Sequence, residues 1–324
     1  MANAMKYKES NQKFIDDLFA AEGSLEKRAA AESLREWAQH YVREDGYARK
    51  MMNPTPVTPD DFVQTDEGRD PFIIRTITPK SAGAINTFWE AGSGGKYMEA
   101  GKYRIYLKRS ATPKYTIDKI YLTAYQGDLV TVFKDLSLMD LLRLEDFDFV
   151  QLSDEAVGEK SVVNETLGVK QWVNAGVDMN PKTFAHALKG MTLARNSGLL
   201  PAKAGVHRSV WIEIMSNMTA SDHSDELYQA AFVGDAAKIS SKMWGIDWVS
   251  VMDLDLIDAA DVYVYAPQEN LGDFVTYQDA QMFTKVEEDQ WLTFGSYSMG
   301  GMNFANPNAV FKVSFTGEIE DWRA

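Results

Sequence analysis

The sequence predicts an α+β fold, because its helix-like and strand-like segments are grouped along the chain. Residues 8–45 carry apolar side chains at helical spacing. Residues 72–122 alternate between polar and apolar side chains, which is typical of strands. A helical pattern over 135–158 then precedes a region in which short strands and helices are mixed. Segregated runs of this kind favour an α+β fold.

The composition limits the classes of function that need to be considered. The chain has 324 residues and no cysteine, which excludes disulfides, thiolate nucleophiles and cysteine zinc sites. Its net charge of −14 opposes tight, non-specific binding of nucleic acid. No apolar run approaches the roughly 20 residues that span a bilayer, and the N-terminus lacks the apolar core of a secretory signal. We therefore expect synthesis in the cytoplasm and no membrane partner.

The first sixty residues have the pattern of an arm. Ser24 is placed to cap a helix that we expect to end at Gly46. The segment Asn53–Pro59 follows, and its three prolines predict an extended connector. An amphipathic helix on such a tether suits an arm that docks on another surface, although packing on its own domain is as common.

Three strands are expected between residues 72 and 122, namely Phe72–Thr78, Tyr103–Arg109 and Tyr115–Leu122. In the second strand the side chains that face one way are Tyr103, Ile105 and Leu107, and those that face the other way are Lys102, Arg104, Tyr106 and Lys108. Glycine-rich residues 91–95 lie between the first two strands, which predicts a long two-stranded projection. Such a ribbon is marginal alone and needs a surface to lie on.

The next expected helix is long. Asp135 can act as its N-cap, and the helix ends at about Gly158. Its apolar residues are spread round the axis, which predicts burial on more than one side. Asn180-Pro181 predicts the start of a further helix.

The rest of the chain is expected to alternate short strands with a helix and turns. The expected strands are Val210–Ile214, Trp248–Met252, Val262–Tyr265, Trp291–Tyr297 and Val310–Phe315. A short helix is expected from Asp235 to about Gly245. Gly300-Gly301 and Asn306-Pro307 are expected to separate the last two strands.

Known catalytic motifs are missing from the sequence. The four histidines, His40, His186, His207 and His223, show no metal-binding spacing. The aspartates Asp253, Asp255, Asp258 and Asp261 lack the glycine and glutamate of a calcium loop, and their alternation with apolar residues favours a strand edge. We therefore expect no enzyme activity, no metal and no cofactor. A soluble α+β hydrolase that uses His223 with nearby aspartates is the remaining enzymatic alternative.

The order of elements resembles a known family of shell proteins. Val210–Asn217 resembles a strand that opens that family's axial domain, and Tyr263–Pro267 with Leu271-Gly272 resembles a later strand and turn. Asn306–Val310 resembles the Asn-Pro-x-Ala run that opens a final strand of its peripheral domain. With the arm, the projection and the long helix, this order is similar to the Hong Kong 97-type capsid fold of tailed-bacteriophage major capsid proteins and encapsulin shells.

The resemblance implies a structural role. The chain would self-assemble into the pentamers and hexamers of an icosahedral virion shell around double-stranded DNA, which it would contain without reading sequence. Scaffold, portal and decoration proteins are the further candidate partners, and an encapsulin-like compartment shell is the alternative within the fold. The implied divisions are an arm (1–60), an extended loop with first peripheral strands (61–130), a peripheral domain with a spine helix (131–204), an axial domain (205–295) and return strands of the peripheral domain (296–324).

Charge suggests how neighbouring subunits would meet. Residues 96–119 hold seven basic and two acidic side chains, a net of +5, whereas residues 135–159 hold one basic and eight acidic, a net of −7. In the family the extended loop lies over a neighbouring subunit, so we hypothesise contacts from Lys96, Lys102, Arg104, Lys108 and Arg109 to Asp140, Glu145 and Asp148. The equally weighted alternative is that both segments are solvated faces.

The resemblance also implies that a covalent bond could join neighbouring subunits. Some family members join a loop lysine to an asparagine of a neighbouring subunit through an isopeptide bond. Lys96 or Lys102 would be the lysine here, and Asn306 the acceptor.

Overall fold

The computed structural model describes residues 46–63, 71–77, 101–124, 129–160, 162–164, 169–175, 200–210, 242–243, 245–251, 253–287 and 291–315. Several expectations fall outside these ranges. They include the helices over 8–45, the glycine-rich residues 91–95, the helix at Asn180-Pro181, residues 211–217 of the expected strand, residues 235–241 of the expected helix, His40, His186, His223 and Lys96.

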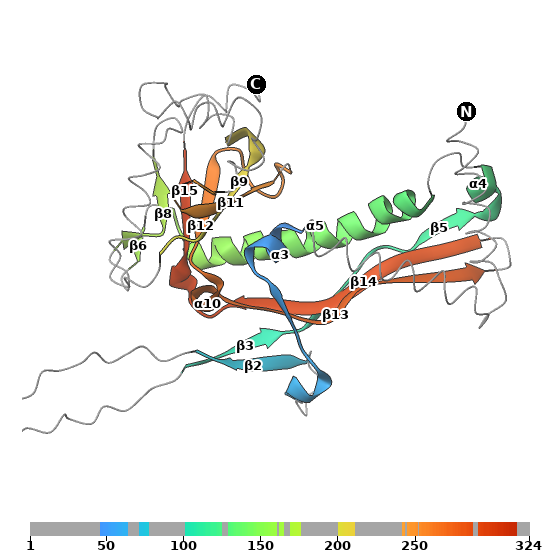
Figure 1. Ribbon diagram of the computed structural model, residues 1–324, viewed down its shortest axis with the longest axis horizontal. Coiled ribbons are helices and arrows are strands. Elements are labelled where there is room, and N and C mark those ends of the chain that lie inside the picture. The colour runs from blue at the N-terminus through green and yellow to red at the C-terminus, as the bar shows by residue number, and fades with distance from the viewer. Residues whose placement is uncertain are drawn as a thin grey trace, which may run out of the picture.

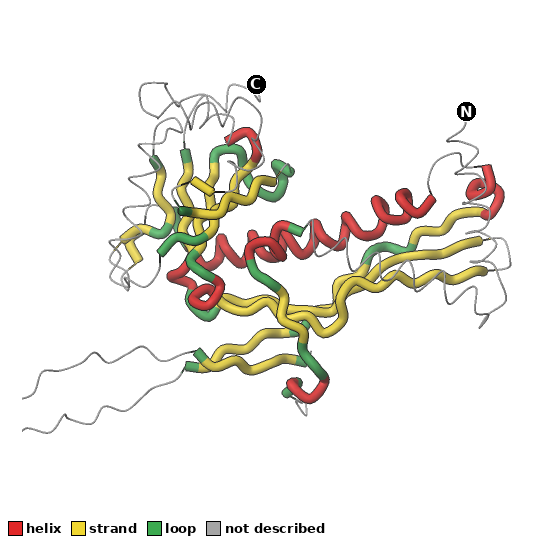
Figure 2. Tube along the Cα trace, in the orientation of Figure 1, coloured by secondary structure: helices red, strands yellow, loops and turns green. Residues whose placement is uncertain are grey.

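Two sheets and one long helix organise the described residues (Figure 1). The helix α5 (Leu129–Val157) runs beside a long five-stranded sheet, and a compact six-stranded sheet lies at its C-terminal end. A two-stranded ribbon extends away from this body; it is the lowest pair of yellow strands in Figure 2. Helices and strands follow one another in separate runs along the chain and not as repeated strand–helix–strand units, which confirms the α+β expectation.

The five-stranded sheet is built on the longest hairpin. Its order is β1 (Pro54–Pro56), β13 (Gly272–Glu287), β14 (Trp291–Phe304) and β4 (Lys108–Ala111), and β5 (Tyr115–Asp118) also pairs with β14. The strand β1 pairs parallel with β13, and the other pairs are antiparallel. The proline-rich connector is therefore extended as expected, and it forms the edge of this sheet.

The six-stranded sheet has the order β10 (Lys242–Met243), β11 (Ile246–Val251), β9 (Lys203–His207), β12 (Asp261–Tyr265), β15 (Val310–Ser314) and β8 (Trp172–Asn174). A small hairpin pairs β6 (Val163–Asn164) with β7 (Val169–Lys170). The strands of each sheet come from more than one of the predicted divisions of the chain. Both β8 and β15 were assigned to the peripheral domain but pair within the six-stranded sheet, and β13 was assigned to the axial domain but lies in the five-stranded sheet.

The main hydrophobic core joins the six-stranded sheet to α5. The ring of Phe149 on α5 lies 5.8 Å from Tyr47, 5.4 Å from Tyr265 and 5.7 Å from Phe304, centroid to centroid. A smaller cluster contains Val57, Ile73, Ile105, Leu107 and Val275. It fixes the base of the ribbon against the five-stranded sheet.

The long helix differs from its expected limits at one end only. It begins at Leu129, so Asp135 is an interior residue and not the N-cap. It ends as predicted before Gly158, whose φ of 74° suits glycine. The helix contacts strands of both sheets, in agreement with the expected burial on more than one side. Among its described side chains, from residue 138 on, the exposed apolar residues are Met139, Leu144 and Phe147.

The start of α4 and the end of β9 differ from the expected boundaries. The expected strand Tyr115–Leu122 stops at Asp118, because the Asp118 carboxylate accepts the N–H of Ile120 at 2.8 Å and starts helix α4 (Lys119–Ala124). Of the strand expected over Val210–Ile214, only Val210 is described. The strand β9 ends at His207, and residues 208–210 are helical.

Turns are found where a helix end and a strand edge were expected. The segment expected to be a helix ending near Gly245 closes with the hairpin β10–β11, in which Gly245 has a φ of 77°. The first part of the aspartate-rich segment is a turn, because the Asp253 carboxylate accepts the N–H of Asp255, and only Asp261 lies in a strand, as the first residue of β12. Residues Pro307–Ala309 form a 3₁₀ turn before β15. Short helices occupy Tyr47–Met51 (α3) and Gln268–Leu271 (α10), and Pro59–Asp61 is a 3₁₀ turn.

Gly300 and Gly301 do not end β14, which continues through them to Phe304. They let another strand approach closely instead. A Cβ atom at Gly301 would lie 2.1 Å from the carbonyl oxygen of Tyr106, the last residue of β3.

Replacing Gly301 with alanine is therefore expected to displace the ribbon and to lower the free energy of unfolding by about 1–3 kcal/mol. Urea unfolding measures the effect. Gly101→Ala is the control, because its Cβ would meet only the flexible side chain of Ile77. Equal stability of the two variants would contradict the close approach.

Candidate assembly surface

The ribbon consists of β2 (Phe72–Thr76) and β3 (Lys102–Tyr106), paired antiparallel with Ile74 opposite Arg104. Its faces are those predicted. Ile105 and Leu107 are buried, whereas Lys102, Arg104 and Tyr106 are exposed. Ile74 is exposed beside Arg104, so the outward face combines positive charge with apolar side chains.

The predicted strand Tyr103–Arg109 divides at Leu107. Residues up to Tyr106 belong to the ribbon, and Lys108–Ala111 form β4 of the five-stranded sheet. Lys108 and Arg109 therefore do not lie on the ribbon. The Nζ atom of Lys108 is 4.0 Å from the Asp148 carboxylate of the same subunit, and the Arg109 guanidinium lies 4.7 Å from the centroid of the Tyr297 ring.

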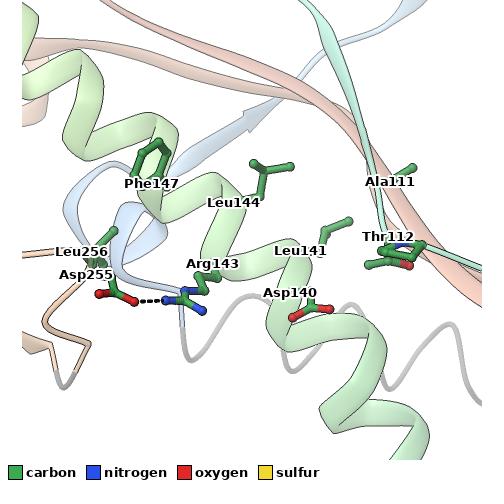
Figure 3. Close-up of a pocket in the computed structure, with 10 residues that line it drawn as sticks. Ala111, Thr112, Asp140, Leu141, Arg143, Leu144, Phe147, Asp255 and Leu256 are labelled. Carbon is green, nitrogen blue, oxygen red and sulfur yellow. Dashed lines mark hydrogen bonds and ion pairs between the residues drawn. The ribbon is translucent and has the colours of Figure 1, made fainter. Parts of the chain in front are cut away.

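The exposed face of α5 borders a groove of about 490 Å³ (Figure 3). Leu141, Leu144 and Phe147 line it from the helix, and the Ala111–Pro113 connection lines the opposite side. Phe147 is 52% exposed to solvent. The groove is thus an apolar surface that the described part of the subunit leaves uncovered.

The rim of this groove is acidic. The guanidinium of Arg143 lies 2.9 Å from the Asp253 carboxylate and 2.7 Å from that of Asp255. The Asp140 carboxylate accepts the hydroxyl of Tyr115 at 2.7 Å. The three carboxylates outnumber the one guanidinium, which favours a basic partner.

Glu145 is not available to a neighbouring subunit, which corrects its predicted role. Its two carboxylate oxygens accept bonds from Nε and Nη2 of Arg49 at 2.9 and 3.1 Å. Nη1 of Arg49 forms an ion pair with Asp279 of β13 at 2.9 Å. The Arg49 side chain is 1% exposed. Burial by itself lowers the pKa of Arg49, but the charges of Glu145 and Asp279 more than offset this and raise it.

This junction could not be found from the sequence. Arg49 lies in a five-residue helix without a recognisable motif, and its partners are about a hundred and more than two hundred residues away along the chain. The acidic excess of 135–159 was the one available signal, because buried carboxylates require partners.

The residues considered for chemistry have structural roles where they are described. The Nδ1 atom of His207 lies 2.7 Å from the Ser209 hydroxyl oxygen at the end of β9. The Asn306 side chain accepts the N–H of Asn308 and caps the turn before β15. Within the described residues, no group of three or more His, Cys, Asp or Glu side chains could hold a metal ion. No helix in that part of the chain is long and apolar enough to cross a membrane.

Comparisons with known proteins identify the fold. No family model matches the sequence, and no curated protein matches it significantly. The mature capsid of bacteriophage PhiM1 matches with a TM-score of 0.54 and 12% identity, over 84% of this chain and 88% of that chain. The capsid of a native GTA particle matches with a TM-score of 0.55 and 10% identity, over 83% and 89%.

A virus-like particle from Pyrococcus furiosus matches with a TM-score of 0.50 and 14% identity, over 87% of this chain and 98% of that chain. At such low identities the likeness is one of fold. It extends over more than four fifths of the chain. The chain therefore has the Hong Kong 97-type capsid fold that its order of elements predicted.

Proposed function

We propose that this chain is a major capsid protein, a structural subunit that assembles into the pentamers and hexamers of an icosahedral virion shell enclosing DNA. The observation that carries the proposal is the shared fold with capsid proteins over most of both chains. Its role is mechanical and not catalytic. Fold alone does not determine function, so the surfaces of the subunit must also suit assembly.

The surfaces support assembly. A ribbon of two strands has little stability alone, and its outward face exposes Ile74 and Tyr106. The groove exposes Leu144 and Phe147, and its rim is acidic, opposite in charge to the basic ribbon. Exposed apolar patches of this kind mark interaction sites.

The ribbon of one subunit suits the groove of the next. Lys102 and Arg104 would face Asp140 and Asp255, and Ile74 would cover apolar surface near Phe147. Each exposed ion pair contributes only about 0–1 kcal/mol, so the charges mainly orient the subunits and the apolar contacts supply affinity.

Purification of the full chain followed by sedimentation and negative-stain microscopy tests the function. Closed shells or rings of five and six subunits are the expected result. A discrete monomer or dimer at every protein concentration would contradict the proposal.

An encapsulin-like compartment is the second candidate, and it rests on the likeness to the virus-like particle, which covers 98% of that chain. Particles isolated from the natural source distinguish the two, because a virion shell protects DNA from nuclease and a compartment contains a protein cargo. No observation among the described residues favours the hydrolase alternative.

Reversing two charges on the ribbon is expected to block assembly. In the double variant Lys102→Glu, Arg104→Glu, the outward face would repel the acidic groove rim. The fraction of protein in shells, measured by sedimentation at moderate salt, should fall at least tenfold. Lys108 is left unchanged because it pairs with Asp148 of its own subunit.

The double variant Lys160→Glu, Lys170→Glu is the matched control, since both lysines are exposed and lie away from the ribbon and the groove. It should assemble normally. Shells of unchanged yield from the ribbon variant would contradict the docking, and equal loss in both variants would show a general effect of charge.

A further inference from the structure

One cation of the subunit lies among the carboxylates of the groove rim. Arg143 is the single basic residue of 135–159, and its side chain on α5 is 57% exposed. Its Nε atom is 2.9 Å from the Asp253 carboxylate, and its Nη2 atom is 2.7 Å from that of Asp255. Figure 3 shows the guanidinium directed from the helix toward Asp255. A guanidinium of the same subunit therefore already occupies the acidic rim that we assign to a neighbouring ribbon.

The turn that carries these aspartates has its own support. Within it, the Asp253 carboxylate accepts the N–H of Asp255 at 3.0 Å, and the Asp253 carbonyl oxygen accepts the N–H groups of Leu256 and Ile257 at 3.2 and 3.3 Å. The Ile257 side chain belongs to the main hydrophobic core and is buried. This wall of the groove is thus anchored from beneath, so it does not need Arg143 to stay in place.

The two ion pairs of Arg143 are easily exchanged. The Asp255 side chain is 84% exposed, so water and salt screen its charge. Exposed ion pairs contribute little to stability, because both side chains are well solvated when they separate. Arg143 can therefore leave the rim at a small cost, in contrast to the buried Arg49.

The ribbon presents a guanidinium that suits the same carboxylates. Arg104 is exposed on β3, and its guanidinium lies 5.3 Å from the centroid of the Phe72 ring. No carboxylate of the described residues forms an ion pair with it. A guanidinium binds a carboxylate through a planar fork that an ammonium group lacks. Arg104 therefore matches the place that Arg143 holds better than Lys102 does.

Building on the proposed shell function, we propose that Arg143 is an internal competitor for the groove. In the separate subunit it pairs with Asp253 and Asp255. On assembly it gives up Asp255 to Arg104 of the neighbouring ribbon and turns toward solvent. Because one guanidinium replaces another, charge orients the ribbon but adds little net affinity. The apolar contact at Phe147 holds the ribbon, and a misplaced subunit can dissociate.

Removing the competitor is expected to promote assembly. In Arg143→Gln both aspartates are free for the ribbon, so the protein concentration at which half of the chains are in shells should fall about fivefold at low salt. Sedimentation of the full chain measures this concentration. A residue that only held the groove wall would have the opposite effect when replaced. An unchanged or higher concentration overturns the proposal.

Three further variants assign the gain to the competitor. Arg143→Lys keeps the charge and should assemble within about twofold of the wild type. Lys160→Gln removes an exposed positive charge away from the groove, so an equal gain there would overturn the proposal by showing an effect of net charge alone. In an Arg104→Gln background, Arg143→Gln should give less than about a twofold gain, because no guanidinium arrives to use the freed carboxylate. A full fivefold gain in that background would overturn the exchange.

Electron cryomicroscopy of wild-type shells checks the exchange without any variant. The Asp255 carboxylate should lie about 3 Å from the guanidinium of Arg104 of the neighbouring subunit, with Arg143 turned away. An intact pair between Arg143 and Asp255 in the shell overturns the exchange and leaves the shell function standing. Wild-type protein that forms no shells at any concentration contradicts the shell function and the exchange together.

Discussion

Replacing Arg49 with methionine is expected to lower the free energy of unfolding by about 3–5 kcal/mol, because it leaves two buried carboxylates without their cation. The Glu145 and Asp279 side chains are 11% and 16% exposed, so water compensates little. Methionine has a similar length and keeps the packing near Phe274, whose ring lies 5.7 Å from the guanidinium. Urea unfolding of unassembled protein, followed by tryptophan fluorescence, measures the loss.

Companion variants separate charge from packing. The triple variant Arg49→Met, Glu145→Gln, Asp279→Asn removes the buried charges together and should recover most of the lost stability. Arg143→Met is the matched control, since its ion pairs with Asp253 and Asp255 are exposed and should contribute less than about 1 kcal/mol. A loss below about 1 kcal/mol in Arg49→Met would show that the junction does not hold the elements together.

Replacing Lys312 with methionine is expected to have the second largest effect, a loss of about 3 kcal/mol. Lys312 lies on β15 with its side chain 7% exposed, and its Nζ atom is 2.9 Å from Asp261 and 3.0 Å from Asp154. The Asp154 side chain is 45% exposed and therefore screened, so most of the cost arises at Asp261.

Aromatic groups complete the Lys312 environment. The Nζ atom lies 4.4 Å from the centroid of the Trp172 ring, and it donates to the Tyr263 hydroxyl at 2.7 Å. Burial raises the pKa of Tyr263 far above its ordinary value, so the hydroxyl stays protonated and donates to Asp154. Lysine, hydroxyl and carboxylate thus join β15 and β12 to the end of α5.

The matched control for Lys312 is Lys160→Met. Lys160 is exposed and lies 5.9 Å from the centroid of the same Trp172 ring. Its replacement should change the unfolding free energy by less than about 0.5 kcal/mol. The double variant Lys312→Met, Asp261→Asn should be more stable than Lys312→Met alone. If the double variant is no more stable, the unpaired Asp261 charge is not the source of the loss.

The sequence could predict the features that depend on local patterns. Alternation in residues 102–107 gave the two faces of the ribbon, and the glycine at 158 gave the end of α5. The order of these elements was enough to predict the fold. The alternation also placed Lys102 and Arg104 correctly on the exposed face of the ribbon.

Features that depend on distant contacts could not be predicted. The strand β13 was missed because its pairing shifts register between Thr276 and Gln281, which breaks its alternation. The pairing of β15 with β12 and β8 joins segments far apart in the chain, so no local pattern could show that these strands share a sheet. The role of Arg49 likewise exists only once α3, α5 and β13 are brought together.

Electron cryomicroscopy of the purified protein tests most directly whether this chain builds a closed shell, as proposed. It should reveal icosahedral particles with five-fold and six-fold rings of subunits, in which the ribbon of one subunit lies in the groove beside α5 of the next. Monodisperse monomers or dimers, without rings at any concentration or ionic strength tested, would contradict it.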